Sequence, residues 1–353
     1  MAKRIGFVLC SSVANAIPST RVAVLNMLPF LHAAGMEPVI LFQPPEPTET
    51  PDLSGVAKRV FDAGCDLVVF QKVHGASALS LAQQLTAVGI RTVYAVCDLV
   101  NVPMVQATDA TIIVTAYLKS LYPLHLQERI HVVHDGIENP EAYKRDWGTA
   151  SGTKHKPLHA TLVTSTDLHS LPVIGHPPPW LSVRIVGRYH LGLRRWREAF
   201  WKWTALPYRD RLRFMRFLTD RKIVCVPWDA IGVYTEMMQA DMGIIPIQTS
   251  LDSAGNVMPL SWQVKSENRL TLKMSMGLPV IATPIPSYED VIQHGVNGFF
   301  ARTASDWNSC LTALRDPARR HAIGLAARAS VAHKYSMQEQ AEKLIKVLAP
   351  LPD

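Results

Sequence analysis

Two cations bracket the predicted start of a helix in the stretch Lys265-Ser266-Glu267-Asn268-Arg269. Ser266 is placed to cap this helix, Glu267 suits the positive end of its dipole, and Gly277 supplies the left-handed residue that ends it. A helix start offers free backbone N–H groups, and Lys265 and Arg269 add positive charge beside them. The stretch is therefore predicted to bind a phosphate or diphosphate. The alternative is that both cations are only solvated.

Polar residues also follow several predicted strands. Thr166 and Asp167 come after the strand predicted at residues 159–164. Hydroxyl and backbone N–H groups there could meet phosphates, although an ordinary turn rich in small polar residues would look the same. Asp98 and His74 follow two other strands, where Asp98 could accept a proton from a hydroxyl group and His74 could donate a hydrogen bond. Single residues of these types are also common in structural roles, and that alternative stays open.

Short apolar segments alternate with helical segments along the whole chain. In the first half, strands are predicted at residues 3–10, 38–42, 66–70, 91–95, 110–114 and 130–133. In the second half, they are predicted at residues 159–164, 181–186, 223–226, 242–245 and 279–283. Such alternation is typical of parallel, doubly wound sheets. We therefore predict an α/β protein with two Rossmann-like domains that face a cleft, where ligands bind at the carboxyl ends of the strands.

A polar segment rich in Pro, Gly, Ser and Thr separates the two halves. We predict an N-terminal domain at residues 1–138, a linker at 139–156 and a C-terminal domain at 157–335. The last predicted helix, within residues 336–353, is long enough to return to the N-terminal domain. The total of 353 residues fits two domains of ordinary size.

Composition excludes several classes of protein. The five cysteines form no C-x-x-C pair, which indicates a reducing compartment and no cysteine-based metal site. No apolar run approaches membrane-spanning length, and the apolar residues 5–10 are too few for a signal peptide, so a cytoplasmic protein is expected. The sequence has no D-x-D pair and no G-x-G-x-x-G after the first strand, so neither a metal centre nor a nicotinamide cofactor is expected.

Positive charge is concentrated in one region. From Arg184 to Lys222 there are 12 Lys and Arg against 3 Asp and Glu, a local charge of +9, whereas the whole chain carries +7. The aromatic residues in this region are Trp196, Phe200, Trp201, Trp203, Tyr208, Phe214 and Phe217. Such a surface suits anionic membrane headgroups, with aromatic rings at the interface. The alternative is a helical hairpin that packs its aromatic rings in the core. Nucleic-acid binding has no recognised motif and is not expected.

Several short motifs follow one another in a definite order. In the C-terminal half they are residues 223–228, 241–246, 265–269 and 276–284, and then His294-Gly295-Val296-Asn297-Gly298-Phe299. Val133-His134-Asp135-Gly136-Ile137 stands at the junction of the two halves. As a set, these motifs resemble those of the GT-B glycosyltransferases, most closely the retaining enzymes grouped around family 4.

The resemblance implies transfer of a sugar from a nucleotide diphosphate sugar to an acceptor, with retention of configuration and without a metal ion or another cofactor. It implies that Lys265 and Arg269 stabilise the leaving diphosphate and that Ser266, Glu267 and Asn268 border the donor. The acceptor is expected to be a glycan or a lipid-linked molecule, as in polysaccharide biosynthesis, which would suit a peripheral place at the membrane.

The resemblance also implies roles for residues outside the predicted helix start. It places Ser11, Ser12 and Arg21 on a loop near the breaking bond and the acceptor, although Arg21 could instead be a helix-start residue without a ligand. Lys72 follows the strand predicted at residues 66–70 and is expected to face the same acceptor side of the cleft. Asp290 falls where the family has a glutamate close to the donor, although Glu289 could equally be the residue that matters.

Two positions depart from the family pattern. Many members carry two glutamates that flank the start of the donor helix, and these positions are Val264 and Leu272 here. Neither side chain can bind the hydroxyl groups of a sugar or ribose, although the cations beside them can still hold a diphosphate. A GT-B-like protein that binds a nucleotide or a partner without turnover therefore stays an alternative.

Overall fold

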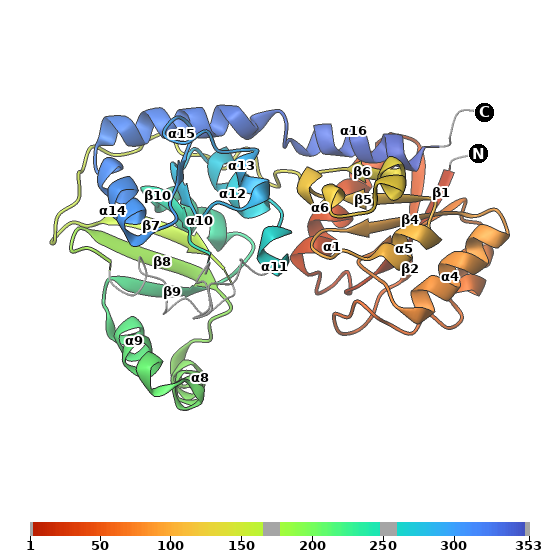
Figure 1. Cartoon of the computed structure of the whole chain (residues 1–353), viewed down its shortest axis with the longest axis horizontal. Coiled ribbons are helices and arrows are strands. Elements are labelled where there is room, and N and C mark those ends of the chain that lie inside the picture. Colours follow the sequence, from red (N-terminus) through yellow and green to blue (C-terminus); the bar gives the residue numbers. More distant parts are fainter. Residues whose placement is uncertain (1–2, 165–176, 248–259, 350–353) are drawn as a thin grey trace. The chain divides into compact units, whose positions relative to one another are not determined.

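The computed structural model describes residues 3–164, 177–247 and 260–349 of the chain (Figure 1). The chain divides into two compact units. The first comprises Met1–Glu138, Pro259–Asn268 and His333–Asp353, and the second comprises Asn139–Met258 and Arg269–Ala332. The residues just before Arg269 therefore belong to the first unit, although they lie in the C-terminal half of the sequence.

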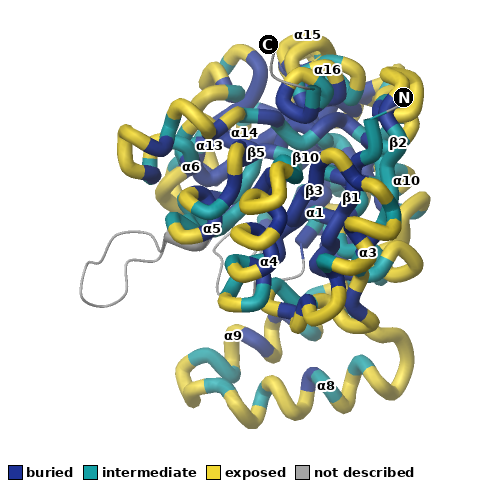
Figure 2. The backbone as a smooth tube through the Cα atoms, turned by 90° about the vertical axis from the view of Figure 1, so that its right-hand side faces the viewer, coloured by how far each residue is buried: buried dark blue, intermediate teal, exposed yellow. Residues whose placement is uncertain are grey.

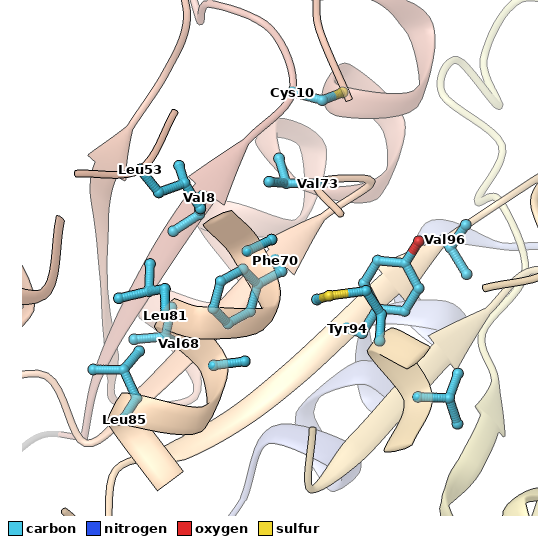
Figure 3. Packing of buried hydrophobic residues seen from close by; sticks show 14 of the residues in the cluster. Val8, Cys10, Leu53, Val68, Phe70, Val73, Leu81, Leu85, Tyr94 and Val96 are labelled. Carbon is cyan, nitrogen blue, oxygen red and sulfur yellow. The ribbon is translucent and has the colours of Figure 1, made fainter. Parts of the chain in front are cut away.

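Six parallel strands form the sheet of the first unit, in the order β2-β1-β3-β4-β5-β6. Their bounds are β1 Lys3–Leu9, β2 Met36–Phe42, β3 Leu67–Gln71, β4 Arg91–Val96, β5 Ala110–Ile113 and β6 Ile130–Val132. The strands are rich in buried apolar residues, as expected of a parallel sheet covered by helices on both faces. Figure 3 shows one buried cluster, in which Val8, Phe70 and Tyr94 pack together with Leu81 and Leu85 of α4.

The first unit contains short helices, of which all but α11 connect its strands. They are α1 Pro18–Ala23, α2 Leu28–Ala33, α3 Val56–Asp62, α4 Ala76–Ala87, α5 Val102–Ala107, α6 Ala116–Ser120 and α11 Leu260–Gln263, with 3₁₀ turns at Leu25–Met27 and Leu124–Arg129. The helical periodicity of residues 21–34 predicts a single helix, but the structure divides this segment between α1, a 3₁₀ turn and α2. Pro29 lies in the first turn of α2 and has no backbone N–H to continue a helix from α1, which explains the break.

The C-terminal helix α16 (Met337–Leu348) packs in the first unit. Its residues Leu344, Val347 and Leu348 share a buried cluster with Ile5 and Val93 of the first sheet. The predicted return of this helix to the first unit is therefore confirmed.

The second unit also contains six parallel strands, in the order β12-β11-β10-β7-β8-β9. They are β7 Leu158–Val163, β8 Leu181–Gly187, β9 Ile223–Pro227, β10 Met242–Ile245, β11 Val280–Ala282 and β12 Phe299–Phe300. The helices are α8 Gly192–Ala205, α9 Tyr208–Thr219, α10 Gly232–Gln239, α12 Asn268–Ser275, α13 Pro286–Glu289, α14 Ala304–Ala313 and α15 Pro317–Ala332. The predicted fold class, an α/β protein with two Rossmann-like units, is confirmed, and the cleft between the units stays a prediction.

The segment at residues 139–156, predicted to be a linker, packs against the second unit. Trp147 is buried, and its Nε1 donates a hydrogen bond to the carbonyl oxygen of Gly277 at 2.7 Å. The guanidinium group of Arg320, fully buried on α15, donates to carbonyl oxygens of the segment, at 2.6 Å for Ala150. Lys144 donates to two carbonyl oxygens at the end of α10. These contacts, here called the Arg320 clasp, make the segment part of the second unit.

Helices α8 and α9 form a hairpin between β8 and the edge strand β9 (Figure 1). Phe214 and Phe217 of α9 are buried in the core of the second unit, whereas Trp196, Phe200 and Trp201 of α8 are exposed. The expectation that the hairpin packs its aromatic rings in the core is therefore correct for only some of them. Among the described residues, no helix combines the length and the apolar composition needed to cross a bilayer.

Candidate functional site at the strand ends

Charged side chains gather at the carboxyl ends of strands in the first unit. Lys72 follows β3, and its Nζ lies 2.8 Å from Oε1 of Glu49 and 2.8 Å from Oδ1 of Asp98, which follows β4. The second carboxylate oxygen of Asp98 lies 3.1 Å from Nζ of Lys265. His74 Nε2 approaches the other oxygen of Glu49 at 3.6 Å. The structure thus brings four predicted residues together with Glu49, which the sequence reasoning missed.

Lys72 has an unusual backbone conformation. Its φ is 58°, the only positive value at a residue other than glycine in the described part of the chain. Its N–H donates a hydrogen bond to the carbonyl oxygen of Ala95 on β4 at 2.8 Å. A left-handed conformation costs a residue with a side chain about 1–2 kcal/mol, so surrounding contacts must maintain it. In this turn the ammonium group of Lys72 is directed at Glu49 and Asp98.

The contacts also fix the charges of the group. Burial alone would favour the neutral forms of Asp98 and Lys72, but the opposite charges around them outweigh it. Lys72 and Lys265 lower the pKa of Asp98 to about 2, and Asp98 and Glu49 contribute to raising the pKa of Lys72. Asp98 is therefore ionised at neutral pH and is a weak base. Its carboxylate is suited to orient the two lysines.

A second group of ionisable side chains lies just after β6. Ser266 Oγ donates a hydrogen bond to Oδ2 of Asp135 at 2.9 Å, and Nδ1 of His134 lies 2.5 Å from Oε1 of the buried Glu267. Burial, followed by the negative charge of Glu267, raises the pKa of Asp135 to about 6. From the sequence, Asp135 is identified only as part of the motif at the junction of the two halves, with no catalytic role. The available signal was its position after a strand, which it shares with Asp98.

Ser11, Ser12 and Arg21 make contacts that stabilise the loops of the first unit. Ser11 is fully buried and donates a hydrogen bond to Oγ1 of Thr20 at 2.8 Å, and Ser12 Oγ accepts a nearby backbone N–H at 3.2 Å. Arg21 donates two hydrogen bonds to the carboxylate of Glu138, at 2.7 and 2.9 Å. The roles predicted for these residues near the acceptor and the breaking bond stay predictions.

The remaining predicted residues lie at or after the start of α12. Asn268 begins α12, Arg269 follows it, and Asp290 is exposed at the end of α13 in the second unit. One turn after Arg269, the fully buried Lys273 donates a hydrogen bond from Nζ to the carbonyl oxygen of Arg269 at 3.3 Å. Burial, followed by the positive charge of Arg269, lowers the pKa of Lys273 to about 7. Thr166 and Asp167 lie outside the described residues.

The two positions that lack glutamates contribute to packing. Val264 is buried in an apolar cluster of the first unit, and Leu272 packs against a cluster of the second unit that includes Met276. Among the described residues, no three His, Cys, Asp or Glu side chains are grouped as ligands for a metal ion.

Solved structures share this fold over nearly the whole chain. The crystal structure of Anabaena HepE in complex with UDP and glucose aligns with a TM-score of 0.67 at 12% identity, over 99% of this chain and 100% of HepE. A glycosyltransferase from Rickettsia africae ESF-5 aligns with a TM-score of 0.68 at 13% identity, over 99% of each chain. Sucrose-phosphate synthase from Thermosynechococcus elongatus aligns with a TM-score of 0.66 at 12% identity, over 98% of each chain. The likeness is one of fold. No protein-family model and no curated protein sequence matches the chain.

Proposed function

We propose that this protein is a glycosyltransferase that uses a nucleotide diphosphate sugar. The observation that carries the proposal is the attachment of the segment from Lys265 to Glu267 to the strand ends of the first sheet, through Asp98, His134 and Asp135. In open α/β sheets ligands bind at such strand ends. The glycosyltransferase from Rickettsia africae and sucrose-phosphate synthase have the same fold, which supports this class of reaction.

Lys265 and Arg269 are proposed to stabilise the diphosphate as it leaves. Lys265 precedes α12 and Arg269 is its second residue, so their charges add to the free N–H groups of the helix start. Fixed cations of this kind stabilise negative charge that develops in the transition state. We propose that they do so without a metal ion.

Asp135 is proposed to accept the proton of the acceptor hydroxyl group. A general base works best when its pKa is close to the operating pH. The pKa of about 6 at Asp135 meets this condition, whereas the pKa of about 2 at Asp98 does not. In this proposal Asp98 positions Lys265 and Lys72, and the hydroxyl group of Ser266 orients Asp135.

UDP-glucose is proposed as the first donor to test. The HepE structures contain UDP, UDP with glucose and UDP-glucose, so a protein of this fold accommodates that donor. Retention of configuration, a glycan or lipid-linked acceptor and a cytoplasmic location complete the proposal. The family 4 group is the proposed place of the chain among glycosyltransferases.

Calorimetric titration with UDP tests the diphosphate site. Lys265→Ala and Arg269→Ala are each expected to weaken binding about 10- to 100-fold, because a hydrogen bond to a charged group contributes about 1.5–3 kcal/mol. Lys58→Ala, which removes an exposed cation paired with Asp62, is the matched control and should leave the affinity unchanged. Equal affinity in all three folded variants would contradict the proposed site.

Binding without turnover is the second candidate function. Val264 and Leu272 favour it, because they pack with apolar residues where many enzymes of the family carry glutamates. Hydrolysis of UDP-, GDP-, TDP- and CDP-sugars separates the two functions. Release of the free sugar from any of them supports the transferase. Nucleotide binding with no release from the whole panel supports the binding protein.

A further inference from the structure

The α8–α9 hairpin exposes apolar side chains along one face of each helix. On α8, Leu193, Trp196 and Phe200 follow one another at the spacing i, i+3, i+7, and Leu193 is 89% exposed. On α9, Tyr208 and Met215 lie on the same helical face as Leu212, and Tyr208 is 79% exposed. Soluble proteins rarely expose aromatic and aliphatic residues in such continuous rows.

The opposite face of the hairpin is fixed in the core of the second unit. Phe214 and Phe217, on the far side of α9 from Leu212, are buried there together with Ala199 of α8. Their rings stack with centroids 6.3 Å apart. The two helices also contact each other through Arg211, whose guanidinium carbon lies 5.0 Å from the ring centroid of Trp203. This anchoring holds the apolar rows outward, and Figure 2 shows most of α8 as exposed.

Arginines without an acidic partner among the described residues also lie on the hairpin, and Arg197, Arg209 and Arg216 flank the apolar rows. From Gly192 to Thr219 there are eight Lys and Arg against two Asp and Glu, a net charge of +6. Glu198 is paired with Arg194 and His190, so its carboxylate does not neutralise the other arginines of the hairpin. Four further arginines of the hairpin have no acidic side chain paired with them in the described part of the chain. These are Arg195, Arg197, Arg209 and Arg216.

We infer that this hairpin docks onto the surface of a bilayer that contains anionic lipids. Tryptophan and tyrosine favour the region between headgroups and acyl chains, and the aliphatic side chains beside them can enter the acyl boundary. The arginines then meet lipid phosphates. Symmetric pairing with the same face of a second copy is disfavoured, because it would bring another +6 against this one. The inference does not depend on the proposed glycosyl transfer.

Co-sedimentation of the full chain with vesicles tests the inference. The protein is expected to sediment with vesicles of equal parts phosphatidylglycerol and phosphatidylcholine, to remain in solution with phosphatidylcholine alone, and to dissociate at high salt. Each cation near an anionic surface strengthens binding about fivefold, so replacing all four unpaired arginines by glutamine should weaken it about 600-fold. The control replaces four exposed lysines elsewhere, Lys58, Lys154, Lys156 and Lys346, by glutamine and should retain binding.

A second variant tests the apolar contribution. Trp196→Ser with Phe200→Ser changes only exposed side chains, so the fold should persist, and binding should fall about 100-fold. Circular dichroism and a thermal melt check that each variant is folded. The inference is overturned if the wild-type chain stays in solution with the anionic vesicles, or if the arginine and control variants bind equally well. It is also overturned if ultracentrifugation shows a dimer that Trp196→Ser with Phe200→Ser dissociates, while vesicles bind nothing.

Discussion

Replacing Lys273 by methionine is expected to stabilise the protein at neutral pH. Lys273 is fully buried on α12, and the only hydrogen bond of its Nζ in the described structure joins it to the carbonyl oxygen of Arg269 at 3.3 Å. The aliphatic part of the Lys273 side chain packs against Gly243 on β10. Any larger residue at position 243 would clash with it, because a Cβ there would lie 2.8 Å from Cδ of Lys273. Methionine has a side chain of similar length and needs no partner for a charge.

The size of the effect follows from the pKa of Lys273. The pKa is about 7 in the folded chain and about 10.4 in an unfolded chain, and each unit of difference corresponds to about 1.36 kcal/mol. Burial of Lys273 therefore lowers the free energy of unfolding by about 4 kcal/mol at pH 7, because the ammonium group must either be buried with its charge or lose its proton. Loss of the hydrogen bond to Arg269 subtracts about 1 kcal/mol. Lys273→Met should thus raise the free energy of unfolding by about 3 kcal/mol at pH 7.

The sign of the pH dependence provides a second test. Between about pH 7 and pH 10 the unfolded chain binds a proton that the folded chain does not, so wild-type stability rises with pH across this window. The methionine variant lacks this rise, and the two proteins should converge near the upper end. Urea unfolding followed by tryptophan fluorescence measures both effects, with Lys58→Met as an exposed control. Destabilisation by Lys273→Met at pH 7, or an equal pH slope in both proteins, would refute the reasoning.

Two further predictions concern the strand ends of the first unit. Lys72→Met should lower the free energy of unfolding by about 3 kcal/mol in urea titrations, because it leaves Asp98 and Glu49 without their shared cation, whereas Lys58→Met should change it by less than about 1 kcal/mol. Equal effects would show that Lys72 is not held by its carboxylates. Asp135→Asn should lower kcat about 100-fold or more, and wild-type activity should rise with pH through about 6 as Asp135 ionises. An unchanged pH–rate profile in Asp135→Asn would exclude Asp135 as the base.

Most of the architecture could be predicted from local sequence patterns. Apolar runs such as Leu67-Val68-Val69-Phe70, within the strand predicted at residues 66–70, are typical of strands buried in a parallel sheet, and β3 is found at Leu67–Gln71. The pattern at residues 288–293 predicts a helix there, whereas α13 begins earlier, at Pro286, because proline is favoured in the first turn of a helix. The aromatic rings of the hairpin could not be divided into buried and exposed sets, since the contacts of Phe214 and Phe217 depend on tertiary packing.

The candidate site was only partly predictable. Lys72 and Asp98 could be found because polar residues that follow apolar runs lie at strand ends. The ion pair between Asp98 and Lys265 was not predictable. It forms because residues 259–268 belong to the first unit, although they lie in the C-terminal half of the sequence. The burial of Glu267 and Lys273 was not visible, because charged residues at and inside a helix usually face solvent. The raised pKa of Asp135 follows from the burial of its surroundings and the nearby Glu267.

The Arg320 clasp has a consequence for exchanging parts between related chains. A second unit transplanted from residue 157 onward would leave behind the Trp147 side chain and the carbonyl oxygens of Trp147, Gly148 and Ala150, which accept hydrogen bonds from Nη2 of Arg320. Its recipient would have to supply new acceptors for the buried Nη2 of Arg320 and fill the space beside Gly277 and Gly324, where the indole ring packs. A transplant that begins at Asn139 carries these acceptors with it. The modular boundary of this protein thus lies between Glu138 and Asn139, at the start of the polar segment and not at its end.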